Sequence, residues 1–133
     1  MAKLIRLKDF DGKVNEPPLR AKRGITSETI GKPIKMTMNR VVIPPGGRNQ
    51  CHYHVKCDAG MHILKGRLKM FFGPPHQQEE AIAEEGDFVF VPQGEIHGLA
   101  NLSDTEPAEL VSCYSGAGSF EEAETIFVEP HKK

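Results

Sequence analysis

The sequence predicts an all-β protein, an antiparallel sandwich or barrel made of short strands. Runs that are rich in Val, Ile and Phe, or that alternate in polarity, recur along the chain, as in Arg40–Ile43, Leu68–Phe72 and Phe88–Val91. Turn-forming residues separate these runs, and 13 Gly and 10 Pro among 133 residues leave little room for a long helix. Many short strands with almost no helix are typical of a sandwich or barrel.

The chain has the length of one domain, and its polarity divides it into three segments. Residues 1–33 are charged, poor in apolar residues and interrupted by prolines, so we expect an N-terminal arm. The sequence leaves open whether this arm lies over the barrel, contacts a neighbouring subunit or stays partly disordered. Residues 34–118 contain the barrel strands. Residues 119–133 are expected to form a short helix, with Ser119 as N-cap and Glu122 completing a capping box, followed by a strand or tail.

Composition and charge exclude several classes of protein. An apolar content of 38% with mixed charges excludes a largely disordered chain. The 17 basic and 18 acidic residues nearly cancel, so nothing attracts nucleic acid to the molecule as a whole. We find no signal peptide and no membrane span, and the three cysteines lack the pairing of a disulfide framework. A cytoplasmic protein is therefore expected.

Three histidines form the candidate metal site. His52 and His54 follow a Pro/Gly turn and lie in a predicted strand. In a strand, residues two apart face the same side, about 7 Å apart along the backbone. His97 follows Phe88–Val91, whose apolarity on both faces predicts a strand deep in the sandwich. Each signal taken alone also fits a hydrogen-bonded histidine without a metal.

Taken together, the two segments resemble the cupin family. The first cupin motif, G-x5-H-x-H-x3/4-E-x6-G, is filled here by Gly46, His52, His54 and Gly66. The second, G-x5-P-x-G-x2-H-x3-N, is filled by Gly86, Pro92, Gly94, His97 and Asn101. The resemblance implies an antiparallel jelly-roll barrel, also called a double-stranded β-helix. It also implies one divalent metal ion in the barrel mouth, bound by His52, His54 and His97.

One position departs from the cupin pattern. The place of the motif's acid holds Ala59, and Asp58 would fit the shorter spacing only with a bulge, so we expect Asp58 to be a loop residue. The ligands would then be three neutral histidines and water. Without the carboxylate the site is about one charge unit more positive, which favours anions, and it keeps open coordination positions.

A three-histidine cupin site resembles those of the thiol dioxygenases and of the diketone-cleaving dioxygenase. In those enzymes Fe(II) binds an anionic substrate before oxygen reacts. We therefore favour Fe(II), although imidazole ligands also suit Zn, Ni, Mn or Cu.

Further side chains could supplement the site or line the pocket. His62 faces away from Ala59 by alternation, and Cys57 lies in the loop after His54, so we favour neither as a ligand. Arg40 or Arg48 could pair with a carboxylate substrate. Glu95 could accept a hydrogen bond from an imidazole. For all three side chains a solvent-exposed position is favoured. The apolar candidates for the pocket wall are Met36, Met38, Met61, Ile63, Phe88 and Phe90.

The expected function is that of an Fe(II) dioxygenase acting on a small organic anion, with the catalytic residues unassigned. The alternatives are a non-redox metal-dependent lyase, isomerase or cyclase, and a cupin that binds a small molecule without catalysis. We expect no nucleic-acid or membrane partner, and a homodimer is expected from the family resemblance.

Overall fold

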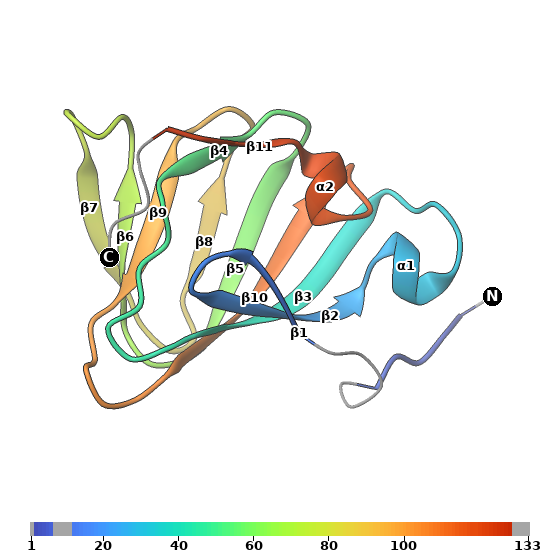
Figure 1. Ribbon diagram of the computed structural model, residues 1–133, viewed down its shortest axis with the longest axis horizontal. Coiled ribbons are helices and arrows are strands. Elements are labelled where there is room, and N and C mark those ends of the chain that lie inside the picture. Colours follow the sequence, from blue (N-terminus) through green and yellow to red (C-terminus); the bar gives the residue numbers. More distant parts are fainter. Residues whose placement is uncertain (1, 7–11, 129–133) are drawn as a thin grey trace.

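The fold consists of two antiparallel β-sheets that face each other (Figure 1). The computed structural model describes residues 2–6 and 12–128, so residues 129–133 of the expected C-terminal segment lie outside the described part. The six-stranded sheet has the order β1 (Gly12–Glu16), β2 (Leu19–Ile25), β3 (Met36–Ile43), β10 (Ala108–Ser115), β5 (Asp58–Lys65) and β8 (Phe88–Val91). The five-stranded sheet has the order β11 (Thr125–Phe127), β4 (His52–His54), β9 (His97–Asn101), β6 (Leu68–Phe72) and β7 (Glu79–Ala83). The all-β jelly-roll prediction is confirmed.

The core lies between the sheets because inward-facing residues alternate along each strand. Its centre is formed by large apolar side chains from both sheets, including Ile43, Ile63, Leu68, Met70 and Leu110, each at most 1% exposed. A second, smaller cluster contains Cys57, Ala59, Val91 and Tyr114 together with Ala123 of α2 (Phe120–Ala123).

Part of the predicted N-terminal arm is built into the six-stranded sheet. Strand β2 pairs antiparallel with β3, and β1 folds back on β2 so that Glu16 lies opposite Leu19. Pro17 and Pro18 form the turn between the two strands. The hairpin therefore has a fixed register relative to β3, and this register positions Glu16.

The two helices have one turn each. The helix α1 (Ser27–Ile30) begins at the N-cap Thr26, and α2 begins at the predicted N-cap Ser119, whose Oγ accepts a hydrogen bond from the Glu122 amide at 3.0 Å. The Glu122 carboxylate binds the amide of Gly118 at 2.7 Å, one residue before the N-cap position that a capping box would use. Neither of these helices is long enough to cross a membrane.

The prediction that Phe88–Val91 is buried on both faces is wrong. The strand β8 lies at the edge of its sheet and pairs with β5, and Phe88 and Phe90 are 79% and 67% exposed. Val91 points inward and is buried, and Val89 packs against the core. The strand is apolar on both faces, but the described residues cover only one of them.

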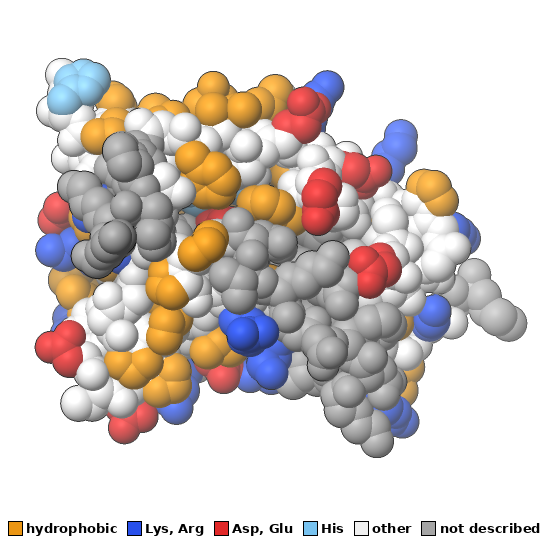
Figure 2. All heavy atoms as spheres, in the orientation of Figure 1, with side chains coloured by type: hydrophobic (Ala, Val, Ile, Leu, Met, Phe, Trp, Pro, Cys, Tyr) orange, Lys and Arg blue, Asp and Glu red, His pale blue; other side chains and the backbone are white. Residues whose placement is uncertain are grey.

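Charged side chains are distributed without segregation over the face shown in Figure 2. Acidic and basic groups both appear on this face, and hydrophobic side chains are visible along its upper edge and between the charged groups. Over the described atoms of this face no continuous basic surface appears.

Candidate metal centre

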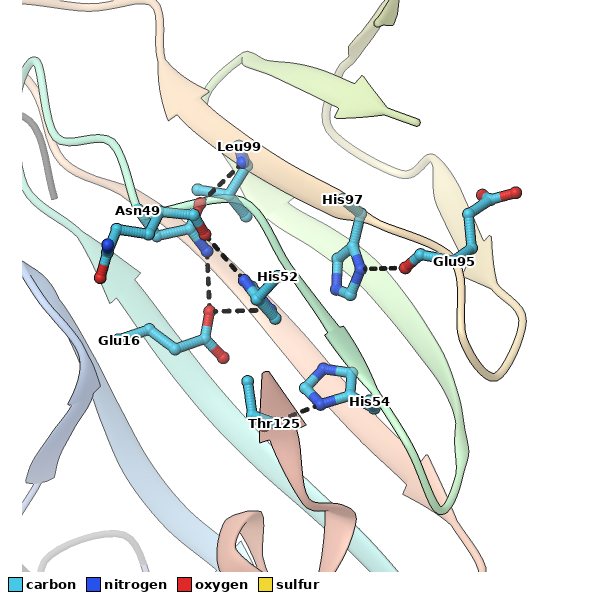
Figure 3. A network of polar contacts seen from close by, with 9 residues as sticks. Glu16, Asn49, His52, His54, Glu95, His97, Leu99 and Thr125 are labelled. Atoms are coloured by element: carbon cyan, nitrogen blue, oxygen red, sulfur yellow. Dashed lines mark hydrogen bonds and ion pairs between the residues drawn. The ribbon is translucent and has the colours of Figure 1, made fainter. Parts of the chain in front are cut away.

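The predicted histidines converge from two neighbouring strands of the five-stranded sheet. His52 and His54 are the two ends of β4, so their side chains leave the same face of the strand. His97 is the first residue of β9 and lies directly opposite His52 in the strand register. One potential ligand atom from each histidine lies within 4.8 Å of those of the other two, and all three side chains are buried (Figure 3).

Each histidine is oriented by a hydrogen bond at its Nδ1 atom. His52 Nδ1 lies 2.8 Å from the carbonyl oxygen of Gln50, and His97 Nδ1 lies 3.0 Å from that of Glu95. Because a carbonyl oxygen can only accept, these two Nδ1 atoms carry protons, and Nε2 is the nitrogen of each ring that a metal ion would bind. His54 Nδ1 lies 2.9 Å from the Thr125 hydroxyl in β11. Such contacts fix the ring orientation in metal sites.

Burial keeps two of the rings neutral. Burial, and to a smaller extent the neighbouring His52, lowers the pKa of His54 from 6.5 to about 4. The same two causes lower the pKa of His97 to about 3, in spite of the opposing hydrogen bond to Glu95. Both imidazoles are therefore neutral near pH 7, and the neutral imidazole is the form that binds a metal ion. The donor set fits a divalent transition metal.

The other candidate ligands lie elsewhere. Asp58 is not the loop residue that was expected: it begins β5 opposite Ser115, and its carboxylate accepts a hydrogen bond from the Gln93 amide at 2.8 Å. Cys57 is buried in the apolar cluster beside Ala59, and burial, followed by the charge of Asp58, raises its pKa. His62 is on the outer face of the six-stranded sheet, where its ring stacks on Phe88 with centroids 4.3 Å apart. None of the three belongs to the histidine group found among the described residues.

One acidic residue at the site was missed by the sequence reasoning. Glu16, at the end of β1, places its Oε2 3.3 Å from Nε2 of His52, and its side chain is only 16% exposed (Figure 3). The same oxygen accepts a hydrogen bond from Asn49 Nδ2 at 2.7 Å. Glu16 lies outside both motifs, and no local pattern marks it.

The histidines open onto a narrow cavity of about 60 Å³. Its wall is largely apolar and includes Leu19, Val41, Met61, Leu99 and Leu110. Neutral polar groups are supplied by Asn39, Asn49, Ser112 and Tyr114. Ala59 also lines this cavity, so the side chain at the motif's acidic position faces the site but brings no ligand.

Most of the predicted pocket residues lie elsewhere. Of the six apolar candidates only Met61 lines the cavity: Ile63 is in the core, and Met36, Met38, Phe88 and Phe90 are exposed. Arg40 pairs with Glu109, and Arg48 lies over the ring of Phe71 at 4.8 Å. The Glu95 side chain is exposed, whereas its backbone carbonyl orients His97.

Comparison with known proteins identifies the family. The Cupin domain family matches residues 39–114, which is more than half of the chain and includes all three histidines. The chain belongs to the cupin family. With this membership, the three converging histidines are the candidate ligands of a cupin metal site.

Two plant proteins are similar in sequence to part of this cupin. Germin-like protein 5-1 of Oryza sativa subsp. japonica is 30% identical over 99 residues, covering 69% of this chain and 43% of its own length. Germin-like protein subfamily 3 member 2 of Arabidopsis thaliana is 32% identical over 66 residues, covering 49% of this chain and 29% of its own. The chain thus spans less than half the length of these relatives.

Solved structures share the fold at low sequence identity. An oxalate oxidase matches 94% of this chain and 63% of its own, with a TM-score of 0.72 and 18% identity. Oxalate decarboxylase from Lactobacillus farciminis matches 93% and 35%, with a TM-score of 0.76 and 18% identity. The polyketide cyclase RemF from Streptomyces resistomycificus matches 98% and 87%, with a TM-score of 0.74 and 19% identity.

Proposed function

We propose that this cupin is a metal-dependent dioxygenase that binds Fe(II) and acts on a small organic anion. The observation that carries the proposal is the convergence of three buried histidines, two of them held neutral by burial, on one narrow cavity. When bound, Fe(II) would supply electrons for the reduction of dioxygen and open positions for a chelating substrate. In a dioxygenase both atoms of the dioxygen molecule enter the product.

The cavity supports a small substrate whose charge is met by the metal ion. A volume of about 60 Å³ is far below the roughly 300 Å³ at which pockets for drug-sized ligands begin. Among the described lining residues there is no Lys or Arg, so the metal ion is the positive charge that an anion would meet. An oxalate oxidase and an oxalate decarboxylase are among the structural neighbours. This supports small carboxylates as one class of candidate substrate.

The chain's own groups would orient the substrate and exclude water. Burial raises the pKa of Tyr114 well above its ordinary value, so its hydroxyl stays protonated near pH 7 and can donate a hydrogen bond. Asn39 and Ser112 offer further neutral hydrogen-bonding groups in the same cavity. The apolar wall limits the access of bulk water, which strengthens these contacts.

Oxygen uptake tests this function. The Fe(II)-loaded protein is given a panel of diketones, thiols, catechol-like acids and small carboxylates in an oxygen-electrode cell. We expect uptake that requires both Fe(II) and one substrate class, and that falls to background in a His97→Ala variant, which loses a ligand. Absence of uptake across the whole panel, with iron bound stoichiometrically, would contradict the proposal.

A non-redox reaction is the second candidate. The similarity to the cyclase RemF, of which this chain covers 87%, favours it because that protein is of comparable size. Conversion of a substrate by the Zn- or Ni-loaded protein under anaerobic conditions would support this candidate over the dioxygenase.

A further inference from the structure

We infer that Glu16 is the anionic ligand of the metal site, supplied by the N-terminal hairpin in place of the acid that Ala59 lacks. The inference rests on the proposed metal-dependent function and deepens it. It also replaces the expected set of three neutral histidines and water by three histidines and one carboxylate.

The hairpin register places Glu16 at the cavity. Glu16 and Leu19 are paired across the turn, and both line the cavity together with the three histidines. The following strand is fixed by its pairing with β3, in which Ala21 lies opposite Val41, and these two residues line the same cavity. The carboxylate therefore belongs to the wall of the site and is not part of a free-standing arm.

A buried amide holds the Glu16 carboxylate in place. Asn49 is 3% exposed, and its Nδ2 donates to Glu16 Oε2 at 2.7 Å. The Oδ1 atom of Asn49 accepts a hydrogen bond from the backbone amide of Leu99 at 2.8 Å. The backbone amide of Asn49 donates to the Leu99 carbonyl at 3.3 Å. Asn49 is thus fastened to β9, the strand that carries His97, and it aims one carboxylate oxygen at the histidine group (Figure 3).

The ring nitrogen of His52 that faces Glu16 is the one left for a metal ion. His52 Nδ1 donates to the Gln50 carbonyl, and Nε2 lies 3.3 Å from the Glu16 oxygen. A divalent metal ion placed among the three histidines, whose ligand atoms lie within 4.8 Å of one another, would be bound by this nitrogen and by the carboxylate oxygen beside it. A carboxylate ligand lowers the net charge of a divalent centre to +1, which a monoanionic substrate would neutralise.

Metal affinity tests the inference without any assay of turnover. Co²⁺ binding is measured by competition with a chromophoric chelator, and the Co²⁺ absorption spectrum reports the ligands. We expect Glu16→Gln, which keeps the shape of the side chain but not its charge, to weaken Co²⁺ binding by about tenfold or more and to alter the spectrum. The matched control is Glu95→Gln, since the exposed Glu95 side chain lies near the site but points away from it (Figure 3). The control should change affinity less than twofold.

The outcomes separate Glu16 from the metal site as a whole. Unchanged affinity and spectrum in Glu16→Gln, with binding abolished in His97→Ala, would overturn the role of Glu16 and leave the three-histidine site intact. Failure of the unaltered protein to bind Co²⁺ would overturn the proposed function itself. If Glu16→Gln does not fold, infrared difference spectra of the unaltered protein decide. One equivalent of metal should shift a carboxylate stretching band, and the absence of any shift would overturn the inference.

Discussion

Hydrogen bonds at Nδ1 leave Nε2 as the nitrogen of each histidine that can bind a metal ion. Two of the partners are backbone carbonyls, of Gln50 and Glu95, each two residues before the histidine that it orients. The third is the hydroxyl of Thr125, which comes from a distant part of the chain. The sequence motifs locate the histidines, but their hydrogen-bond partners depend on the path of the backbone and on the pairing of β11 with β4.

Removal of the Thr125 hydroxyl should weaken metal binding. A Thr125→Val substitution nearly preserves shape but takes away the group that orients His54, so we expect metal affinity to fall about tenfold. Isothermal titration with Zn²⁺ measures this change. Thr105→Val, at an exposed loop position, is the control and should bind Zn²⁺ like the unaltered protein. Equal affinity of both variants would show that the hydroxyl does not orient the ligand.

The metal-free protein should lose stability as the pH falls from about 6.5 to about 4. In this window the unfolded chain takes up protons at His54 and His97, while burial keeps the folded-state pKa values at about 4 and 3. Each histidine contributes a slope of up to roughly 1.4 kcal/mol per pH unit, and above pH 6.5 the contribution is constant. Urea unfolding at pH 7 and pH 5 measures the free energy of unfolding.

A substitution at one of these histidines should reduce this pH dependence. In His97→Gln one of the two proton-linked groups is absent, so the loss of stability between pH 7 and pH 5 should be smaller than in the unaltered protein. His76→Gln removes an exposed histidine and should leave the loss unchanged. The same loss in all three proteins would contradict the assignment to buried histidines.

The carboxylate of the site could not be predicted from the sequence. Motif spacing correctly showed that Ala59 occupies the acidic position, and from this the site was expected to contain only neutral ligands. Glu16 reaches the site because β2 pairs with β3 in one register and a two-residue turn brings Glu16 opposite Leu19. No periodicity or motif in residues 1–33 encodes that contact, which depends on tertiary structure.

Among the elements, β8 shows where strand patterns stop being informative. A strand that is apolar on both faces is expected to be covered on both faces. The strand pattern does not tell which residues or which chain would cover them. Here Val89 and Val91 face the core, while Phe88 and Phe90 are exposed. The position of His97 after this strand was predicted correctly as buried, but its burial comes from β4 and β9 and not from the depth of β8.

The turns at the motif glycines give a matched pair of predictions. Gly66 and Gly86 both have φ of +90°, which strains any other residue. A Cβ at Gly66 would lie 2.9 Å from Cβ of Ala108, whereas a Cβ at Gly86 would meet nothing within 4 Å. We expect Gly86→Ala to cost about 1 kcal/mol and Gly66→Ala at least about 1 kcal/mol more, because it adds overpacking to strain.

Urea unfolding of the two alanine variants at pH 7 measures this difference. A Gly66→Ala variant no less stable than Gly86→Ala would show that the turn between β5 and β6 can move away from Ala108.

For the whole molecule, the outer face of the six-stranded sheet carries aromatic side chains that the described residues leave exposed. The strand register aligns Phe90 with Gly60, Cys113 and Met38, and Phe88 with His62. On the same face, His62 Nδ1 and Arg40 Nε are buried without a hydrogen-bond partner. Exposed aromatic residues on an edge strand favour association with another protein chain. Natural proteins limit such association by covering the strand edge.

We propose that a second copy of this chain covers this face. A twofold axis lying between two such faces would pack Phe88 and Phe90 of one copy against the same face of the other, so the exposed aromatic side chains are covered and the assembly closes as a dimer. We expect sedimentation velocity to show a dimer at micromolar concentration, and the double variant Phe88→Ser/Phe90→Ser to sediment as a monomer. Leu102→Ser removes a hydrophobic side chain that is 41% exposed outside this face and should leave the dimer intact. A monomeric unaltered protein, or a dimer that survives the double substitution, would contradict an interface at β8.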